Sequence, residues 1–417
     1  MKTVGIVAEF NPFHYGHEYL IRTLKEQTGS DYAVVIMSGD YTQRGAPAIF
    51  DKYARTKMAL LCGADLVLEL PVYYSTSSAE FFAGGAISIL NNSGCIDFLG
   101  FGSESGNVKA LENIASVLLD EPEEYSFLLK ENLKSGKNYA AARSCALSSY
   151  LGSDISVISN ANDILGTEYI KALKLQKSSI VPFCIKRKGS SYDDVSLSDT
   201  PDIYSSAKAI RFLIESEGFS FNDPNALTSY IPKSAVDVLK ETIQNSGHFA
   251  MHIDDFSDFM HFKLLSEKNN GFDKYLDVSS DLSDKITSHI AGFSCITDFT
   301  AALKSKDITY TRISRALLHI LLGMTKESFS NYVKDKERPC SYIRILGLNK
   351  NASPLLKKLQ ECSSIPVISK LSDAYKALPE REYMLLKETV AASNIYDLVS
   401  GKSKINEFAK AVITVNR

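Results

Sequence analysis

Two histidines stand where a short apolar run gives way to a helical pattern. The run Val4–Ala8 is typical of a buried strand, and His14 and His17 follow it after an Asn-Pro turn. This order places both imidazoles at the carboxyl end of a strand beside a helix N-terminus, where open α/β sheets bind ligands and free N–H groups favour phosphate. Their spacing turns both side chains the same way. We expect them to donate hydrogen bonds to charge that develops during displacement at phosphorus, with no covalent step.

Other interpretations of the pair remain open. The histidines could be partly buried residues that cap the helix, or they could be metal ligands, although no nearby Cys or third His supports a metal site. Gly16, which stands between them, would leave the backbone free to approach a ligand closely.

The elements that must position these residues follow from the apolar pattern. Strands are expected at 4–8, 32–37, 64–70, 96–101 and 180–186, separated by helices that include 51–61 and 79–90. Such alternation predicts an α/β fold with a parallel, doubly wound sheet over residues 1–215. Residues 216–417 are predicted to be mainly helical, with helices near 234–243, 256–267, 283–290, 311–323 and 352–362 and a short strand pair near 342–348 and 366–369.

Composition narrows the class of protein. The chain has 417 residues, is 45% hydrophobic and carries a formal charge of -3, which is typical of a globular protein of two or three domains at roughly 150 residues each. Its apolar runs are shorter than the ~20 residues of a membrane span, and no signal-peptide pattern opens the chain. Its seven cysteines lack CxxC spacing, which favours a reducing compartment and argues against disulfides or zinc. We predict a cytoplasmic enzyme with no membrane partner and no metal held by the protein.

A basic segment lies in the second half. Residues 304–358 contain 12 Lys and Arg against 4 Asp and Glu, and such a cluster is a candidate footprint for a phosphate backbone. The members that we expect to bind nucleic acid are Lys304, Lys306, Arg312, Arg315 and Arg344. A solvated helical face is the alternative from charge alone.

A second motif, Tyr204-Ser-Ser-Ala-Lys-Ala-Ile-Arg211, opens another predicted helix. Ser205 or Ser206 can cap that helix, its N-terminus can face phosphates, and Lys208 or Arg211 can supply positive charge. Two serines before a helix are also a common cap with no further role.

These motifs resemble a known family. His14-Tyr-Gly-His17 is similar to the HxGH signature of the nucleotidyltransferase superfamily. The longer strings from Gly5 to His17, Met37 to Ala48, Asp65 to Pro71, Asn160 to Gly166 and Thr311 to Gly323 resemble the bacterial tRNA(Met) cytidine acetate ligase family. The resemblance covers essentially the whole chain. It implies a Rossmann-like catalytic domain over 1–215 and a tRNA-binding region over 216–417.

The resemblance also implies an activity. Such an enzyme activates acetate with ATP as acetyl-adenylate, releases pyrophosphate, and passes the acetyl group to N4 of the wobble cytidine of elongator tRNA(Met). The ATP contacts expected for this chain are Val7, Ala8, Glu9, Phe10, Asn11, Pro12, Phe13, His14, Gly16, His17, Leu20, Gly102, Asn162, Arg187, Lys188, Ser205 and Ser206. Mg²⁺ is expected to arrive on the nucleotide phosphates.

The loop after the second strand supplies the remaining candidates. Asp40 is the type of group that could accept the proton of the attacking amine, and Arg44 could meet acetate or phosphate oxygens. Asp40 could equally stabilise its loop. For Asn162 the alternative is a helix N-cap, and for Arg187 and Lys188 it is exposed charge at a strand end. Two other functions stay open: a small-molecule adenylyltransferase, and a non-catalytic RNA-binding protein that uses ATP as a structural ligand.

Overall fold

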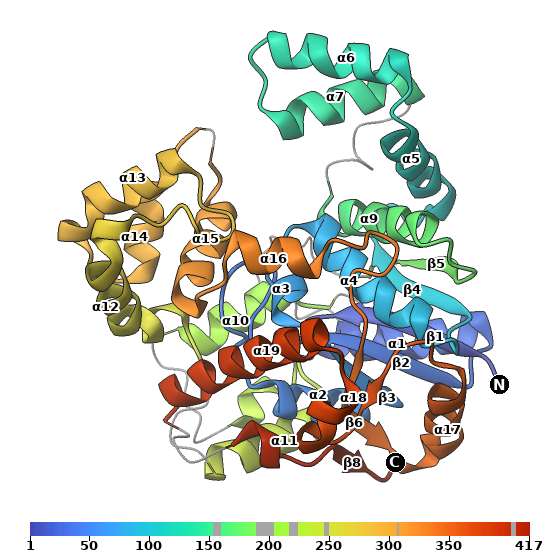
Figure 1. Cartoon of the computed structure of the whole chain (residues 1–417). Coiled ribbons are helices and arrows are strands. Elements are labelled where there is room, and N and C mark those ends of the chain that lie inside the picture. Colours follow the sequence, from blue (N-terminus) through green and yellow to red (C-terminus); the bar gives the residue numbers. More distant parts are fainter. Residues whose placement is uncertain (153–159, 189–203, 217–223, 246–249, 307, 402–405) are drawn as a thin grey trace.

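A computed structural model describes residues 1–152, 160–188, 204–216, 224–245, 250–306, 308–401 and 406–417. At its centre lies a sheet of eight strands, and helices cover both faces (Figure 1). The strands are β1 (Thr3–Ala8), β2 (Tyr32–Ser38), β3 (Leu66–Leu70), β4 (Phe98–Ser103), β5 (Val181–Lys186), β6 (Ile343–Asn349), β7 (Val367–Ile368) and β8 (Ile413–Val415).

The order across the sheet is β5-β4-β1-β2-β3-β6-β7, and β8 also pairs with β6. The first five strands run parallel, as predicted. The chain moves from β1 through β2 to β3 on one side, and β4 then returns to the other side of β1. This reversal between β1 and β4 is the point at which doubly wound sheets bind ligands.

Alternate residues of each strand enter two separate cores. Val35 and Met37 of β2 pack on one face, whereas Val34 and Ile36 pack on the other. Both faces are therefore covered, which explains why the strands are continuous apolar runs instead of alternating ones.

The helices before the end of the predicted first domain are α1 (Tyr15–Thr28), α2 (Lys52–Leu61), α3 (Val72–Ser75), α4 (Ala79–Asn92), α5 (Val108–Asp120), α6 (Glu123–Lys134), α7 (Tyr139–Leu151), α9 (Ala161–Leu175) and α10 (Ala207–Glu215). Those that follow are α11 (Lys233–Asn245), α12 (Ser257–Glu267), α13 (Ser280–His289), α14 (Ile296–Leu303), α15 (Tyr310–Leu322), α16 (Lys326–Tyr332), α17 (Ser353–Cys362), α18 (Ala374–Ala377) and α19 (Glu380–Val399). No helix within the described ranges is long and apolar enough to cross a membrane.

The C-terminal part of the chain returns to the central sheet. The strand predicted near 342–348 is β6, which lies antiparallel to β3, and it also pairs with β7 and β8. Residues 343–415 are thus not a separate helical region, and the division at residue 215 does not separate two independent folds. The helices α12 to α15 do stand apart as a lobe beside the sheet (Figure 1).

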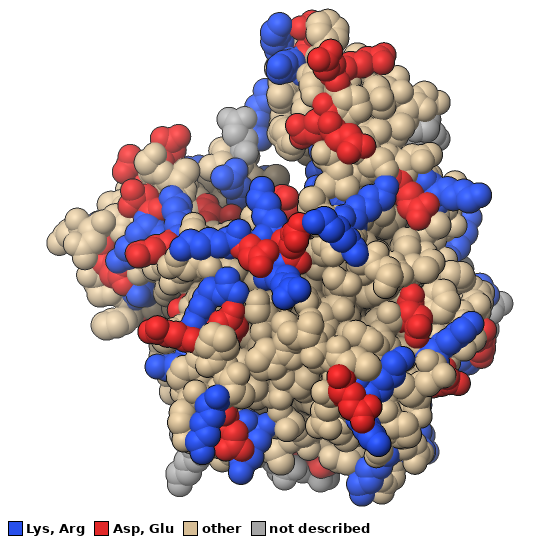
Figure 2. Space-filling model, turned by 45° about the vertical axis from the view of Figure 1, so that its right-hand side comes forward, with Lys and Arg blue, Asp and Glu red and all other residues tan. Residues whose placement is uncertain are grey.

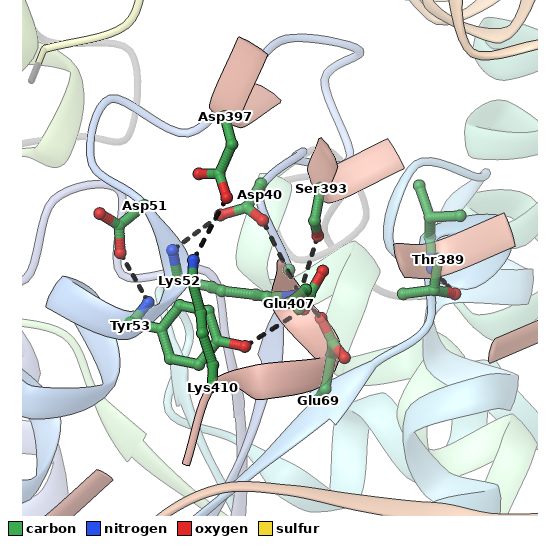
Figure 3. Close-up of polar contacts among 12 residues, drawn as sticks. Asp40, Asp51, Lys52, Tyr53, Glu69, Thr389, Ser393, Asp397, Glu407 and Lys410 are labelled. Atoms are coloured by element: carbon green, nitrogen blue, oxygen red, sulfur yellow. Dashed lines mark hydrogen bonds and ion pairs between the residues drawn. The ribbon is translucent and has the colours of Figure 1, made fainter. Parts of the chain in front are cut away.

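A buried ionic network fixes this return (Figure 3). Lys52 of α2 contacts Glu69 of β3 at 2.6 Å and also pairs with Glu407. Arg344 of β6 contacts Glu69 at 2.5 Å and Glu407 at 2.8 Å. The prediction that Arg344 binds tRNA is therefore wrong, because its guanidinium lies inside the protein and two carboxylates already neutralise it.

Candidate active site

A cavity of about 460 Å³ opens at the carboxyl ends of β1 and β4. Fifteen of the predicted ATP contacts line it: Val7, Ala8, Glu9, Phe10, Asn11, His14, Gly16, His17, Leu20, Gly102, Asn162, Arg187, Lys188, Ser205 and Ser206. Pro12 and Phe13 do not. Phe13 is fully buried behind the cavity, where its ring lies 5.6 Å from the ring of His17 and supports it.

The two histidines begin α1 and hold each other in place. The Nδ1 atom of His14 accepts a hydrogen bond from Gly16 N at 3.0 Å, and the Nδ1 atom of His17 accepts one from His14 N at 3.3 Å. The ring centroids are 3.8 Å apart. Since both Nδ1 atoms accept, the neutral rings carry their protons on Nε2. Each histidine is thus a helix cap, as the alternative interpretation held, and also a hydrogen-bond donor at the cavity wall.

Both imidazoles are neutral in this environment. Burial, together with the charges of Arg187 and Arg211, lowers the pKa of His14 to about 3. Burial also lowers the pKa of His17 well below its ordinary value, with His14 and Arg187 adding to the effect. A neutral donor suits a site that already holds several cations.

These pKa shifts predict that neither histidine titrates between pH 5 and 8 in the ligand-free protein. The pKa of His14 is about 3 in the folded protein and 6.5 in the unfolded chain, so the unfolded chain binds more protons between pH 3 and 6.5. The folded state therefore loses stability as pH falls from 6.5 towards 3. Imidazole ¹H–¹⁵N spectra, recorded for the folded protein and for the protein in denaturant, measure this directly. A midpoint near 6.5 for either ring in the folded protein would contradict the assignment.

The turn between β1 and α1 has a constrained backbone. Phe10 has a φ of 49°, in the left-handed region that side chains disfavour. Hydrogen bonds hold the turn on both sides: Arg55 donates to the Glu9 carbonyl at 2.6 Å, and Arg211 donates to the Asn11 carbonyl at 2.5 Å. Asn11 Oδ1 accepts from Ile49 N at 2.8 Å. The turn is consequently fixed by α2 and α10 before any ligand arrives.

The second predicted motif faces the same cavity. Ser206 is the N-cap of α10, and its hydroxyl accepts from Ala209 N at 3.0 Å. Tyr204, Ser205, Lys208 and Arg211 join it in the lining. The serine motif is therefore a cap and also directs a helix N-terminus at the cavity, an arrangement that favours anions.

Gly102, Asn162 and Arg187 meet on the opposite wall. A β-carbon on Gly102 would lie 3.3 Å from the Arg187 Cγ atom, so glycine makes room for that side chain. Asn162 donates to the Glu104 carboxylate at 2.5 Å. Asn160, and not Asn162, is the N-cap residue of α9. Asn162 is thus placed to contact a ligand.

Charge in the cavity favours a polyanion. The lining contains five Lys and Arg residues (Arg44, Arg187, Lys188, Lys208 and Arg211) against three carboxylates (Glu9, Glu215 and Asp254). Burial raises the pKa of Glu9, although a hydrogen bond from Gln43 N and the charges of Arg211, Arg55 and Arg44 oppose the increase. Within the described ranges, no group of three His, Cys, Asp or Glu residues could hold a metal ion.

The prediction that Asp40 accepts the proton of the attacking amine is wrong. Its side chain is 4% exposed and lies outside the cavity lining, where it accepts from Lys52 N at 2.8 Å and faces the Lys52 ammonium at 3.8 Å. The carboxylate accepts from the first N–H of α2, whose N-cap is Asp51, and belongs to the buried ionic network, so it cannot reach an amine in the cavity. The alternative interpretation of Asp40 as a loop-stabilising residue is the one that the geometry supports. Arg44, from the same loop, does line the cavity.

Part of the wall comes from residues that the sequence analysis missed. Met251, His252, Ile253 and Asp254 precede α12, and Thr297 lies in α14. No motif marks them, because they reach the cavity only when the lobe of α12 to α15 packs against the sheet. The cavity therefore has a nucleotide-type wall from the sheet and a second wall from the lobe.

Gly45 joins this lobe to the cavity. It has a φ of 77°, and a β-carbon there would lie 2.4 Å from the backbone nitrogen of Arg315. Ser314 of α15 also donates to the Gly45 carbonyl at 2.9 Å. The loop that carries Gln43 and Arg44 is thereby pressed against α15.

We expect Gly45→Ala to push this loop away from α15 and to lower the free energy of unfolding by about 1–3 kcal/mol. Thermal unfolding and ATP affinity measure the effect. Gly292→Ala is the matched control, because Gly292 has no atom within 4 Å of the added carbon. Equal stability of the two variants would show that the loop is not held as described.

The predicted tRNA contacts are spread over the lobe. Lys304 and Lys306 are exposed between α14 and α15, and Arg312 is exposed on α15. Arg315 is largely buried and pairs with Asp277 at 3.0 Å, so the two arginines do not present equivalent free charges. Figure 2 shows that Lys and Arg on this face alternate with Asp and Glu and do not form one unbroken positive surface.

Comparisons with known proteins show the family of this chain. A model of the HIGH nucleotidyl transferase family matches residues 1–410. The tRNA(Met) cytidine acetate ligase of Acetivibrio thermocellus is 39% identical over 95% of this chain and 94% of its own length. That of Clostridium novyi is also 39% identical, over 96% and 97%. The chain belongs to this ligase family.

Solved structures of the family share the whole fold. The crystal structure of Thermotoga maritima TmcAL without ligand superposes with a TM-score of 0.91 at 30% identity, and all of both chains is covered. A second crystal structure of that protein, bound to alpha-thio ATP, gives a TM-score of 0.88. The predicted fold class, a Rossmann-like nucleotidyltransferase domain with a doubly wound parallel sheet, is confirmed.

Proposed function

We propose that this protein is an ATP-dependent acetate ligase that forms N4-acetylcytidine at the wobble position of elongator tRNA(Met). The observation that carries the proposal is the cavity with a sheet wall and a lobe wall, in a chain whose relatives are named for this reaction. The sheet wall, with its neutral histidines and cations, suits a nucleotide triphosphate. The lobe wall leaves room for a second substrate. The cytoplasm is the expected compartment for a reaction between ATP and tRNA.

In the first step an acetate oxygen attacks the α-phosphorus of ATP, and the bond to pyrophosphate breaks. The Nε2–H groups of His14 and His17 would donate to phosphate oxygens as charge develops on them. Lys208 and Arg211, at the N-terminus of α10, would neutralise the leaving pyrophosphate. In the part of the chain that the structure describes, no group of three His, Cys, Asp or Glu residues could hold a metal ion, so Mg²⁺ would be held by the phosphates and water.

In the second step the exocyclic N4 of cytidine attacks the carbonyl carbon of acetyl-adenylate, and AMP leaves. The base must be unstacked from its neighbours to enter the cavity. Three exposed basic residues follow Thr297 of the lobe wall along the chain, and we propose that they contact the tRNA backbone: Lys304, Lys306 and Arg312. Arg315 would act mainly by positioning α15, since Asp277 already pairs with it.

The test is pyrophosphate release from ATP, with and without acetate and tRNA(Met), followed by transfer of labelled acetate to the tRNA. We expect release that depends on acetate and label that appears only in a tRNA with cytidine at the wobble position. A matched transcript with uridine there is the control. Release with acetate but no labelled tRNA would favour a small-molecule adenylyltransferase. Binding of tRNA without release under any condition would favour a non-catalytic protein.

A further inference from the structure

The helices α5, α6 and α7 form a module that projects from the body of the protein (Figure 1). The module is inserted between β4 and α9, and it has a small core of its own: Ile114, Val117, Tyr125, Ala146 and Leu147. None of its residues lines the cavity. Its outer surface is therefore unused by the nucleotide site.

The hairpin end of this module is basic. Residues 127–139 contain Lys130, Lys134 and Lys137 with Glu131 as the one acidic residue, in a chain whose net charge is -3. All three lysines are exposed, and the Lys134 side chain is 77% exposed even though it lies 3.0 Å from Glu131. Figure 2 shows Lys and Arg side chains together along one edge of the projecting part. Such a charge excess complements a phosphate backbone.

Two aromatic side chains lie in the same stretch of chain as the lysines. Phe127 is 64% exposed and Tyr139 is 60% exposed, so both rings are open to solvent. Phe127, Lys130 and Lys134 follow one another at three- and four-residue spacing, so they share one face of α6. Exposed rings beside lysines are the combination that binds unpaired nucleotides, because any base can stack on a ring while its phosphate meets an ammonium.

We propose that the hairpin end of α6 and α7, residues 127–139, is a second tRNA contact that holds the backbone and an unpaired base away from the cavity. The proposal rests on the proposed function, which makes tRNA the second substrate. A contact on a module outside the cavity would secure the body of the tRNA while one nucleotide enters the site. It would affect binding of the tRNA and leave the chemistry of the bound complex unchanged.

The test is a pair of charge reversals. Lys130→Glu with Lys134→Glu removes the basic face of α6. Lys233→Glu with Lys240→Glu on α11, at the far end of the molecule in Figure 1, is the matched control. The match is close because Lys134 pairs with Glu131 and Lys240 pairs with Asp237, each at i,i+3 spacing on a helix.

We expect the α6 variant to raise the Kd and the KM for a tRNA(Met) transcript about tenfold at 0.1 M salt and to reduce the salt slope of binding by about 2. Its kcat at saturating tRNA should match that of the control. Phe127→Ser should weaken binding without changing the salt slope. Affinity and slope equal to those of the control variant would overturn the proposal. Binding is measured by itself, so an enzyme that bound this tRNA but released no pyrophosphate with acetate would refute the proposed function and leave the contact established.

Discussion

Replacing His17 by alanine should lower acetate-dependent pyrophosphate release by a factor of about 10²–10³, the usual loss when one preorganised donor to a developing oxyanion is removed. The imidazole is held on one side by the His14 backbone N–H and on the other by the ring of Phe10, whose centroid lies 4.9 Å away. Its Nε2–H is therefore aimed before ATP binds. Alanine leaves the cavity open to ATP and removes only the donor.

His289→Ala is the control for this variant, because His289 is exposed at the end of α13 and outside the cavity. Steady-state release and thermal unfolding should be measured for both proteins. A His17→Ala rate within twofold of the control, in a protein that unfolds at the same temperature, would remove His17 from the chemistry. A loss of rate that the loss of thermal stability fully accounts for would mean that His17 serves only as a helix cap.

Glu407→Gln should lower the free energy of unfolding by about 3–5 kcal/mol, the range found when one partner of a buried ion pair is removed. Glu407 pairs with Lys52 (Figure 3) and also with Arg344, and all three side chains are almost fully buried. The glutamine variant leaves two buried cations with Glu69 as their nearest remaining carboxylate. The network joins α2, β3 and β6, so its loss weakens the contact between the first five strands and the C-terminal strands.

The pH dependence of stability follows from the same network. Burial alone would raise the pKa of Glu407, but Lys52 and Arg344 lower it to about 2. The stability from this carboxylate is therefore present above its unfolded-state pKa near 4.5 and is lost as pH falls from there to about 2. Denaturant unfolding at several pH values should show a flatter acid limb for Glu407→Gln than for the wild type.

Glu361→Gln is the matched control for this prediction. Glu361 also pairs with a lysine, Lys357, at 3.8 Å, but both side chains are more than 60% exposed. Exposed pairs of this kind contribute about 0–1 kcal/mol. Losses of similar size for Glu407→Gln and Glu361→Gln would mean that the buried network does not hold the sheet together.

The sequence by itself determined the five parallel strands and the nucleotide wall, whereas β8 was not predicted. Val4–Ala8, the Asn-Pro turn and the two histidines define a strand, a turn and a helix cap through local chemistry, since each depends on neighbours within a few residues. The same holds for the serines before α10, and 15 of the 17 predicted ATP contacts line the cavity. The prediction that Phe13 lines the cavity is wrong. Side chains in one turn point to different sides, and their spacing does not tell which side each one faces.

Only the tertiary structure decided the roles of isolated charges. Asp40, Arg44 and Arg344 all looked like surface or site residues by type, yet Arg44 lines the cavity whereas Asp40 and Arg344 are buried. Asp40 contacts Lys52, which is 12 positions away, and Arg344 contacts Glu69, which is 275 positions away. No local sequence pattern predicts such pairs. The role of a charged side chain depends on which groups neutralise it. In this protein those groups come together only when β6 pairs with β3.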